Sequence, residues 1–252
     1  MAVSVRALGV LSLAAFGVGL AAATVGAQAP PGRTVWDGVY SDTQATRGKD
    51  AYEANCARCH REDLMGGQGP ALAGERFMNT YEADSINRLF TTIRTRMPRD
   101  AAGTLPEQNY IDIVAYVLKS NTFPPGTADL VPDPAVLRGI RVFPKDGPRP
   151  VANFALVKMV GCLTQGPAGW TVTSASDPIA TKNPAASVEE ELKDAEALPL
   201  GTQSVELLTL VVNPAEADKG KKVEAKGLLI RRTQGNRVNL TSLQALAPTC
   251  AN

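Results

Sequence analysis

The sequence predicts two domains of different class, an all-α domain followed by a mainly-β small barrel or sandwich. Residues 46–122 repeat apolar side chains at helical spacing, whereas residues 151–252 contain short runs rich in Val, Leu and Thr that are typical of strands. Residues 123–150 separate the two and contain seven of the 18 prolines. A chain of 252 residues with 44% hydrophobic content allows two cores of this kind.

The first 27 residues have the pattern of a secretory signal peptide. Arg6 supplies a positive charge, residues 7–29 are uncharged and largely apolar, and residues 25–27 offer small side chains for cleavage after Ala27. The apolar run is also near the length that spans a bilayer, so a retained anchor is the alternative. We expect a periplasmic or secreted protein with no transmembrane span after cleavage.

The first helix is expected to begin near Thr46, after an extended lead-in at residues 28–45. Gly48, Tyr52 and Cys56 follow at intervals of four residues. Because residues four apart lie on one helical face, these three side chains are predicted to share a face.

A second helix is predicted after a glycine-rich loop at residues 61–74. Ser85 can cap this helix, and Met97-Pro98 ends it, because proline disfavours helix in the residue before it. Its apolar stripe comprises Ile86, Leu89, Phe90 and Ile93.

The last helix of this domain has the clearest periodicity in the chain. Pro106 suits its first turn, and Asn121 is a plausible stop. Its apolar stripe comprises Tyr110, Ile113, Val114, Val117 and Leu118. The sequence therefore predicts a compact helical domain at residues 46–122.

Residues 123–150 are predicted to be a stiff, extended linker because of their prolines. Five strands are expected after it, at residues 154–163, 169–176, 204–212, 221–231 and 236–246. A short helix is expected at residues 187–198, with Ser187 and Glu190 as a capping box. The helix of an OB barrel follows the third strand, so the domain is OB-like only if residues 178–182 add a short strand.

The only histidine of the chain lies in a C-x-x-C-H motif formed by Cys56, Cys59 and His60. This motif is a signature for covalent haem attachment, in which two thiols form thioethers with the haem vinyl groups and the histidine binds the iron. A redox disulfide lacks its usual βαβ context here, and a zinc site lacks nearby partners. We therefore expect one covalent haem c per chain, held by these three residues.

The sixth iron ligand is expected to be a methionine, because the chain has no second histidine. Met65 is too close to His60 to reach the opposite face of a haem, and Met159 lies in a predicted strand of the other domain. Met97, directly after a helix and before a proline, is favoured. Met78, in a stretch with little predicted structure, is the remaining competitor.

Residues 46–122 resemble a class I c-type cytochrome. The resemblance is carried by GKDAYEANCARCH, GQGPALAG, TRMP and YIDIVAYVLKSN, in the order found in that family. It implies that Gly48 and Tyr52 pack the first helix against the last, near Tyr110 and Val114.

The resemblance also has implications for the site. It implies that the Pro70 carbonyl accepts a hydrogen bond from His60 and so fixes the imidazole ring. It places the methionine ligand at Met97.

Cys162 and Cys250 are expected to form a disulfide, because the chain is predicted to work in an oxidising compartment. The alternative is two buried free thiols.

These features predict an electron carrier, not an enzyme. If protein groups fill both axial positions, no site remains for a substrate on the iron. The balance of 26 basic against 25 acidic side chains, and the scarcity of aromatic residues in the β-rich domain, argue against a nucleic-acid partner. The expected partners are redox proteins, a dehydrogenase or an oxidase, with the β-rich domain as a docking module.

Two alternatives remain open at this point. One is a haem enzyme or gas sensor with a labile sixth position, and the other is a β-rich binding module for which the haem is a redox switch. A further question concerns six arginines around the haem elements, which form either a basic rim for an acidic partner or, as we favour, a solvated face. They are Arg58, Arg61, Arg88, Arg94, Arg96 and Arg99.

Overall fold

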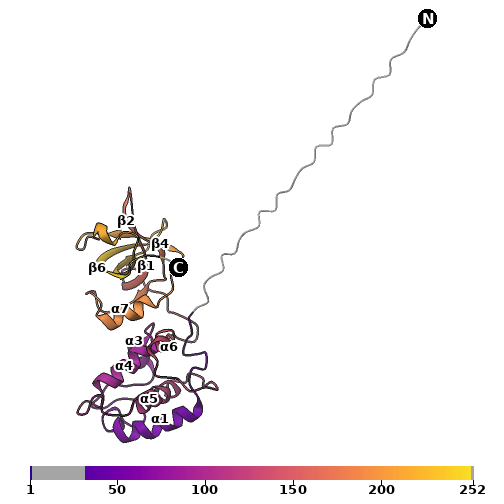
Figure 1. The fold of residues 1–252 in the computed structure, drawn as a ribbon, viewed down its shortest axis with the longest axis vertical. Helices are drawn as coiled ribbons and strands as arrows, with labels where there is room; N and C mark the ends of the chain where they lie inside the picture. The colour runs from indigo at the N-terminus through magenta and orange to yellow at the C-terminus, as the bar shows by residue number, and fades with distance from the viewer. Residues whose placement is uncertain (2–31, 251–252) are drawn as a thin grey trace. The chain divides into compact units, whose positions relative to one another are not determined.

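The computed structural model describes Met1 and residues 32–250, with a helical part followed by a strand-rich part (Figure 1). Apart from Met1, the predicted signal peptide lies outside the described residues, as do residues 28–31 of the lead-in. In the part of the chain that is described, no helix is both long and apolar enough to cross a bilayer. The two predicted structural classes are confirmed in their predicted order.

The first helix, α1 (Asp42–Asn55), begins four residues before the expected Thr46. Ser41 caps it, since the Ser41 hydroxyl oxygen accepts the Gln44 backbone N–H at 3.0 Å. The helix leads into the short α2 (Ala57–His60), which contains most of the C-x-x-C-H motif.

The tightest helix contact joins α1 to α5 (Glu107–Ser120). A Cβ atom at Gly48 would lie 1.8 Å from the Asp112 carbonyl oxygen, so a glycine is needed where the two backbones meet. One turn further along α1, the Tyr52 ring lies 5.3 Å from the Tyr116 ring, centroid to centroid. Gly48 and Tyr52 therefore pack the first helix against the last as predicted, with Asp112 and Tyr116 as their closest partners.

The second predicted helix is α4 (Ile86–Arg96), with Ser85 as its N-cap. The Ser85 hydroxyl oxygen accepts the Arg88 backbone N–H at 3.2 Å. All the side chains of both predicted apolar stripes, on α4 and α5, are buried. The capping residue and the apolar stripes of these helices were correctly predicted, because both patterns depend only on residues close together in the sequence.

A short helix between the glycine-rich loop and α4 was missed. Residues 75–81 form α3 (Glu75–Tyr81), where the sequence reasoning placed Met78 in a stretch with little structure. The helix is short and has no capping side chain, and burial of Phe77 and Tyr81 holds it in place. Tertiary packing, not local propensity, stabilises it.

Residues 123–150 are not an extended linker throughout. Residues 134–138 form α6 (Pro134–Arg138), capped by the Asp133 side chain. Five apolar side chains of this segment are buried in the helical core: Phe123, Leu130, Leu137, Ile140 and Val142. The apolar residues between the prolines fold the segment back onto the helices.

The lead-in packs on the same core. Val35, Val39 and Tyr40 are buried in it, and isolated backbone bridges pair Thr34 with Arg141 and Ser41 with Gly126. The described part of the lead-in is therefore joined to the segment that follows α5.

The described strand-rich part contains six strands and one α-helix, with a short 3₁₀ helix at Glu216–Asp218 between β4 and β5. In chain order they are β1 (Leu156–Gly166), β2 (Gly169–Ala175), β3 (Ile179–Ala180), α7 (Glu189–Glu196), β4 (Gln203–Leu208), β5 (Lys222–Ile230) and β6 (Arg237–Ala247). All five predicted strands and the helix are present.

The five long strands close into a ring in the order β1-β2-β4-β6-β5-β1, which makes this part a barrel. Every pair is antiparallel except β4–β6, which is parallel. This is the strand order of an OB barrel, but α7 comes before the third long strand instead of after it. The short β3 at the predicted position pairs with β1 and lies outside the ring.

The predicted capping box of α7 is shifted by one residue. Val188 is the N-cap, and its backbone N–H donates to the Glu191 carboxylate at 3.4 Å. The Ser187 hydroxyl instead donates to the buried Glu224 carboxylate at 2.6 Å. Glu190 pairs with Arg138 at 3.2 Å. The prediction failed because tertiary partners compete for both side chains.

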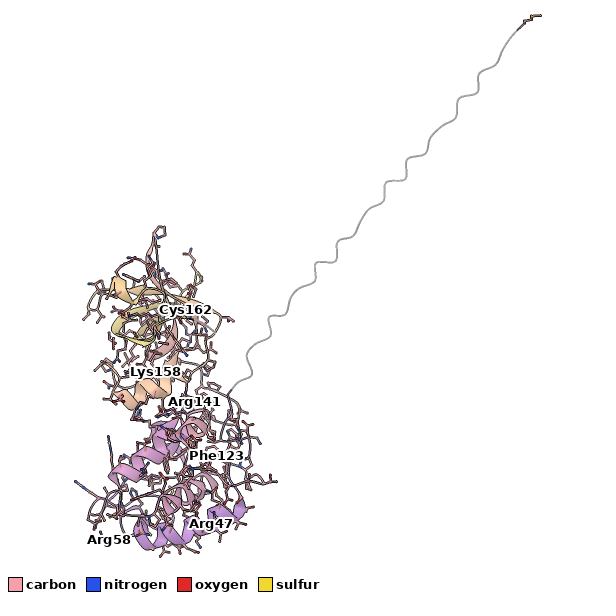
Figure 2. The ribbon with its side chains drawn as sticks, in the orientation of Figure 1. Arg47, Arg58, Phe123, Arg141, Lys158 and Cys162 are labelled. Atoms are coloured by element: carbon pink, nitrogen blue, oxygen red, sulfur yellow. A yellow bond between two sulfur atoms is a disulfide. The ribbon has the colours of Figure 1, made fainter. Side chains whose placement is uncertain are left out.

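Contacts from α7 join the barrel to the helical part, and residues 32–250 belong to one compact unit. The Asp194 carboxylate accepts hydrogen bonds from the Ser85 hydroxyl at 2.6 Å and the Asn87 side chain at 3.4 Å. Arg141, which is labelled in Figure 2, donates to the Asp194 carbonyl at 3.0 Å. Lys158 of β1 pairs with Asp84 at 3.5 Å.

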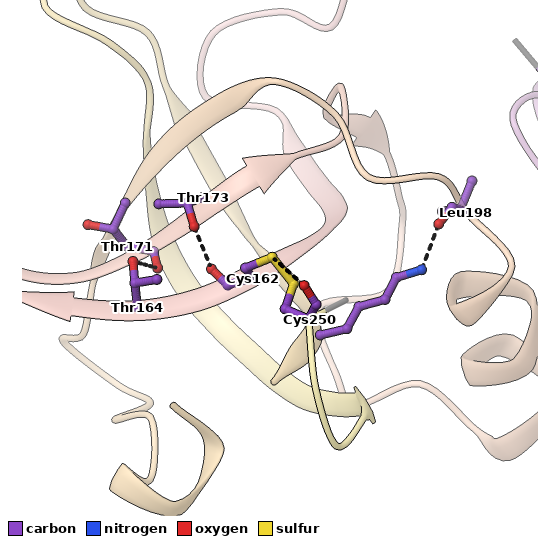
Figure 3. The surroundings of a disulfide bond; sticks show 7 residues. Cys162, Thr164, Thr171, Thr173, Leu198 and Cys250 are labelled. Carbon is purple, nitrogen blue, oxygen red and sulfur yellow. Dashed lines mark hydrogen bonds between the residues drawn. A yellow bond between two sulfur atoms is a disulfide. The ribbon is translucent and has the colours of Figure 1, made fainter. Parts of the chain in front are cut away.

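The predicted disulfide is present between Cys162 in β1 and Cys250 (Figure 3). Their Cα atoms are 5.4 Å apart, and 88 positions separate them in the chain. The Cys250 backbone N–H donates to the Gly220 carbonyl at 3.0 Å. The bond ties the end of the described chain to the first barrel strand.

Replacing both Cys162 and Cys250 by serine is expected to destabilise the barrel by up to about 4 to 5 kcal/mol, the chain-entropy value for a loop of this size. Hydrogen exchange followed by peptide mass spectrometry should show faster exchange in β1 and β6. Equally large losses of protection in α1 and α5 would contradict a local role.

Gly48→Ala is expected to lower the free energy of unfolding of the helical part by about 1 to 3 kcal/mol or more, because its methyl group overlaps the Asp112 backbone. Gly166→Ala is the matched control, since a Cβ there meets nothing within 4 Å. Urea unfolding of both variants measures the difference. Equal stability of the two variants would show that α1 and α5 do not meet at Gly48.

Candidate haem-binding site

One helical turn positions the two thiols and the imidazole of the C-x-x-C-H motif. Cys56 ends α1 and precedes α2, and its carbonyl oxygen accepts the backbone N–H groups of Cys59 at 3.1 Å and His60 at 3.0 Å. Both cysteines are free thiols and are partly exposed, whereas His60 is only 6% exposed. The sequence-predicted residues are therefore brought together at one place.

A hydrogen bond to the loop backbone fixes the His60 ring. Its Nδ1 atom lies 2.7 Å from the Pro70 carbonyl oxygen. Because a carbonyl oxygen only accepts, Nδ1 carries the proton and Nε2 keeps a free lone pair for a metal. The contact implied by the resemblance to class I cytochromes is present.

The loop packs closely against the same ring. A Cβ atom at Gly69 would lie 2.6 Å from the His60 Cε1 atom and 2.9 Å from its Nε2 atom. Only a residue without a side chain lets the backbone approach the imidazole this closely. Gly69 is therefore part of the site, although its glycine-rich context indicated only a loop.

Two further residues hold this loop, and the sequence reasoning missed the role of both. The Tyr52 hydroxyl donates to the Arg61 carbonyl at 2.7 Å, directly after the histidine. The Asn121 side chain donates to the Leu72 carbonyl at 2.9 Å and accepts the Gly74 backbone N–H at 2.9 Å. Asn121 was recognised only as a helix stop, because its partners are distant in sequence.

Burial raises the pKa of the Cys56 thiol to about 11, and the neighbouring Cys59 acts in the same direction. Cys56 is therefore a neutral thiol at pH 7.

The methionines differ in where they lie. Met65 is 58% exposed, and Met159 is fully buried in the barrel core. Met97 and Met78 are both partly buried against the helical core. Met97 is the C-cap residue of α4, and its N–H donates to the Ile93 carbonyl at 3.0 Å. Burial thus leaves the same two candidates that the sequence left.

These residues fit a covalent haem. Two free thiols and an imidazole with an available Nε2 lie on a single helical turn, beside an apolar core that includes two partly buried thioethers. Cys56, Cys59, His60 and a methionine would hold it.

Most of the arginines considered as a basic rim are paired with carboxylates. The pairs are Arg58–Asp100 at 2.9 Å, Arg61–Asp63 at 2.9 Å, Arg88–Asp84 at 3.2 Å and Arg94–Glu107 at 3.1 Å. Neighbouring acids balance these positive charges. The pairing therefore favours a solvated surface of mixed charge over a uniformly basic rim.

Residues 43–117 match a family model described as cytochrome C oxidase, cbb3-type, subunit III. This segment is a c-type cytochrome domain. The matched segment contains the C-x-x-C-H turn, the loop with Pro70, and Met97, which supports the monohaem class I assignment and the predicted helical fold. It covers less than a third of the 252 residues and does not include the barrel. No curated protein and no solved structure matches the chain.

Gly69→Ala is expected to disturb the cytochrome domain at the histidine, because the added methyl group overlaps the imidazole. Cys56 and Cys59 are unchanged, so haem should still attach covalently, but the ferric spectrum should gain high-spin character. Visible spectroscopy and mass spectrometry of the purified variant measure the two effects. A low-spin spectrum identical to that of the wild type would contradict the close packing of Gly69.

Proposed function

We propose that the protein is a periplasmic or secreted monohaem cytochrome that carries single electrons between redox partners. Cys56 and Cys59 would hold haem c by thioether bonds, one haem per chain, and His60 and Met97 would bind its iron. When bound, the haem supplies a reversible one-electron change at its iron. The observation that carries the proposal is the His60–Pro70 hydrogen bond, which leaves Nε2 free on the helical turn that also carries the two thiols.

The protein groups around the site favour electron transfer over bond-making chemistry. With an imidazole and a thioether as ligands, neither axial position is left for a substrate. The low exposure of His60 gives the site an apolar environment, which disfavours the extra charge of the oxidised state, and a methionine ligand acts in the same direction. Both effects raise the reduction potential.

The proposed location is supported by two observations. The N-terminal sequence has the pattern of a signal peptide, and the structure contains the Cys162–Cys250 disulfide. Disulfides persist mainly in oxidising compartments such as the periplasm.

The proposed partners are a dehydrogenase that supplies electrons or an oxidase that accepts them. The description of the matched family names a subunit of a cytochrome c oxidase, which supports the second. We propose that the barrel docks the cytochrome domain to that partner. Leu210 and Val211 support this role, since they are adjacent and each is 79% exposed after β4.

Met97→Ala is expected to remove the weak long-wavelength sulfur-to-iron band of the ferric protein and to convert it to a high-spin form that binds cyanide. The reduction potential should fall by on the order of a tenth of a volt or more, since axial ligands set haem potentials over roughly 0.8 V. Visible spectroscopy and a redox titration measure both effects.

Met78→Ala is the matched control, because Met78 is also partly buried against the helical core. If Met78→Ala loses the band and Met97→Ala keeps it, the methionine ligand is Met78 and not Met97. A wild-type protein that is high-spin and binds carbon monoxide after reduction would instead be a haem enzyme or gas sensor.

A further inference from the structure

A buried tyrosine ties together the two ends of the segment that carries Met97. This segment, residues 97–105, connects α4 to the start of α5. The Tyr110 hydroxyl donates to the Met97 carbonyl at 3.2 Å and accepts the Leu105 backbone N–H at 3.2 Å. Tyr110 itself is 1% exposed, so its hydroxyl forms hydrogen bonds to these two backbone groups instead of to water.

The other hydrogen bonds and the ion pair within residues 98–104 are local or exposed. Ala101 and Thr104 make local turns, in which their N–H groups donate to the Pro98 and Ala101 carbonyls at 2.9 and 3.3 Å. The Asp100 side chain pairs with Arg58 at 2.9 Å, but these side chains are 65% and 78% exposed. Exposed ion pairs contribute little and are screened by salt. Tyr110 therefore provides a buried link between this segment and α5.

The histidine side of the site uses the same device. Tyr52 of α1 donates to the Arg61 carbonyl directly after His60, and Tyr110 of α5 donates to the Met97 carbonyl. Since α1 and α5 meet at Gly48, each helix of one tightly packed pair holds the backbone beside one proposed ligand.

We propose that Tyr110 is a positioning residue for the methionine ligand. Its hydroxyl holds the Met97 backbone in place, and this restraint keeps the thioether available to the iron. Without the hydroxyl the Met97 carbonyl and the Leu105 N–H both lose their partner, and the segment moves more freely. The inference rests on the proposed function, in which Met97 is an axial ligand.

The test is a titration of the ferric holoprotein with imidazole. Loss of the sulfur-to-iron absorption band reports how much imidazole has displaced the methionine. Tyr110→Phe is expected to lower the apparent Kd for imidazole about tenfold, the effect of losing one net hydrogen bond. Tyr116→Phe is the matched control, because it removes a hydroxyl from the same helix and its ring packs on Tyr52. An unchanged Kd in Tyr110→Phe, or an equal change in both variants, would overturn the proposal.

Met97→Ala separates failure of this inference from failure of the proposed function. If the wild-type protein has the sulfur-to-iron band and Met97→Ala loses it, Met97 is confirmed as the ligand. The imidazole titration then tests Tyr110 alone. If the band survives in Met97→Ala, the ligand assignment is wrong and the role of Tyr110 falls with it.

Amide exchange measured by NMR on the wild-type holoprotein gives a readout that needs no variant. The Leu105 amide should exchange at least about tenfold more slowly than in an unstructured peptide, because it donates to a buried hydroxyl. A Leu105 amide that exchanges freely would overturn the proposal even if Tyr110→Phe did not fold.

Discussion

The contact between α1 and α5 at Gly48 is the constraint on which the proposed site depends. At this point the two backbones are too close for any side chain, since a Cβ at Gly48 would lie 1.8 Å from the Asp112 carbonyl oxygen. The C-x-x-C-H turn continues directly from α1, and α5 carries both Tyr110 and Asn121. The separation of one helix pair thus sets the histidine turn, the loop beside the imidazole and the Met97 segment relative to one another.

The barrel adds a second level of constraint. Ser85 caps α4 with its oxygen and donates its proton to Asp194 of α7, so one hydroxyl serves both the helix that ends at Met97 and the contact with the barrel. The disulfide ties Cys250 to β1, the strand that also carries Lys158 toward Asp84. The buried carboxyl of Asp84 has a pKa raised by desolvation, which the positive charges of Lys158 and Arg88 oppose. The cytochrome domain and the barrel therefore share polar contacts whose partners come from both.

The parts that could be predicted from the sequence are those whose signals are local. The Ser85 cap, the apolar stripes of α4 and α5, and the five long strands each depend on neighbours in the chain. The missed features depend on distant partners: α3 is held by buried aromatic rings, and residues 123–150 fold onto the helical core through apolar side chains between prolines. At the site, the C-x-x-C-H motif identified the ligand turn, but Gly69, Tyr52 and Asn121 act through contacts that no spacing rule contains.

The two sides of the proposed site are held with different strength, and this difference bears on function. On the histidine side, hydrogen bonds of 2.7 Å fix the imidazole and the following carbonyl, and the Gly69 backbone packs against the ring. On the methionine side, the hydroxyl bonds of Tyr110 are 3.2 Å and the ion pair between Asp100 and Arg58 is exposed. If Met97 binds the iron as proposed, a ligand exchange would therefore begin there. The proposed carrier and the alternative gas sensor would then be two uses of one scaffold, distinguished by how strongly Tyr110 restrains the Met97 segment.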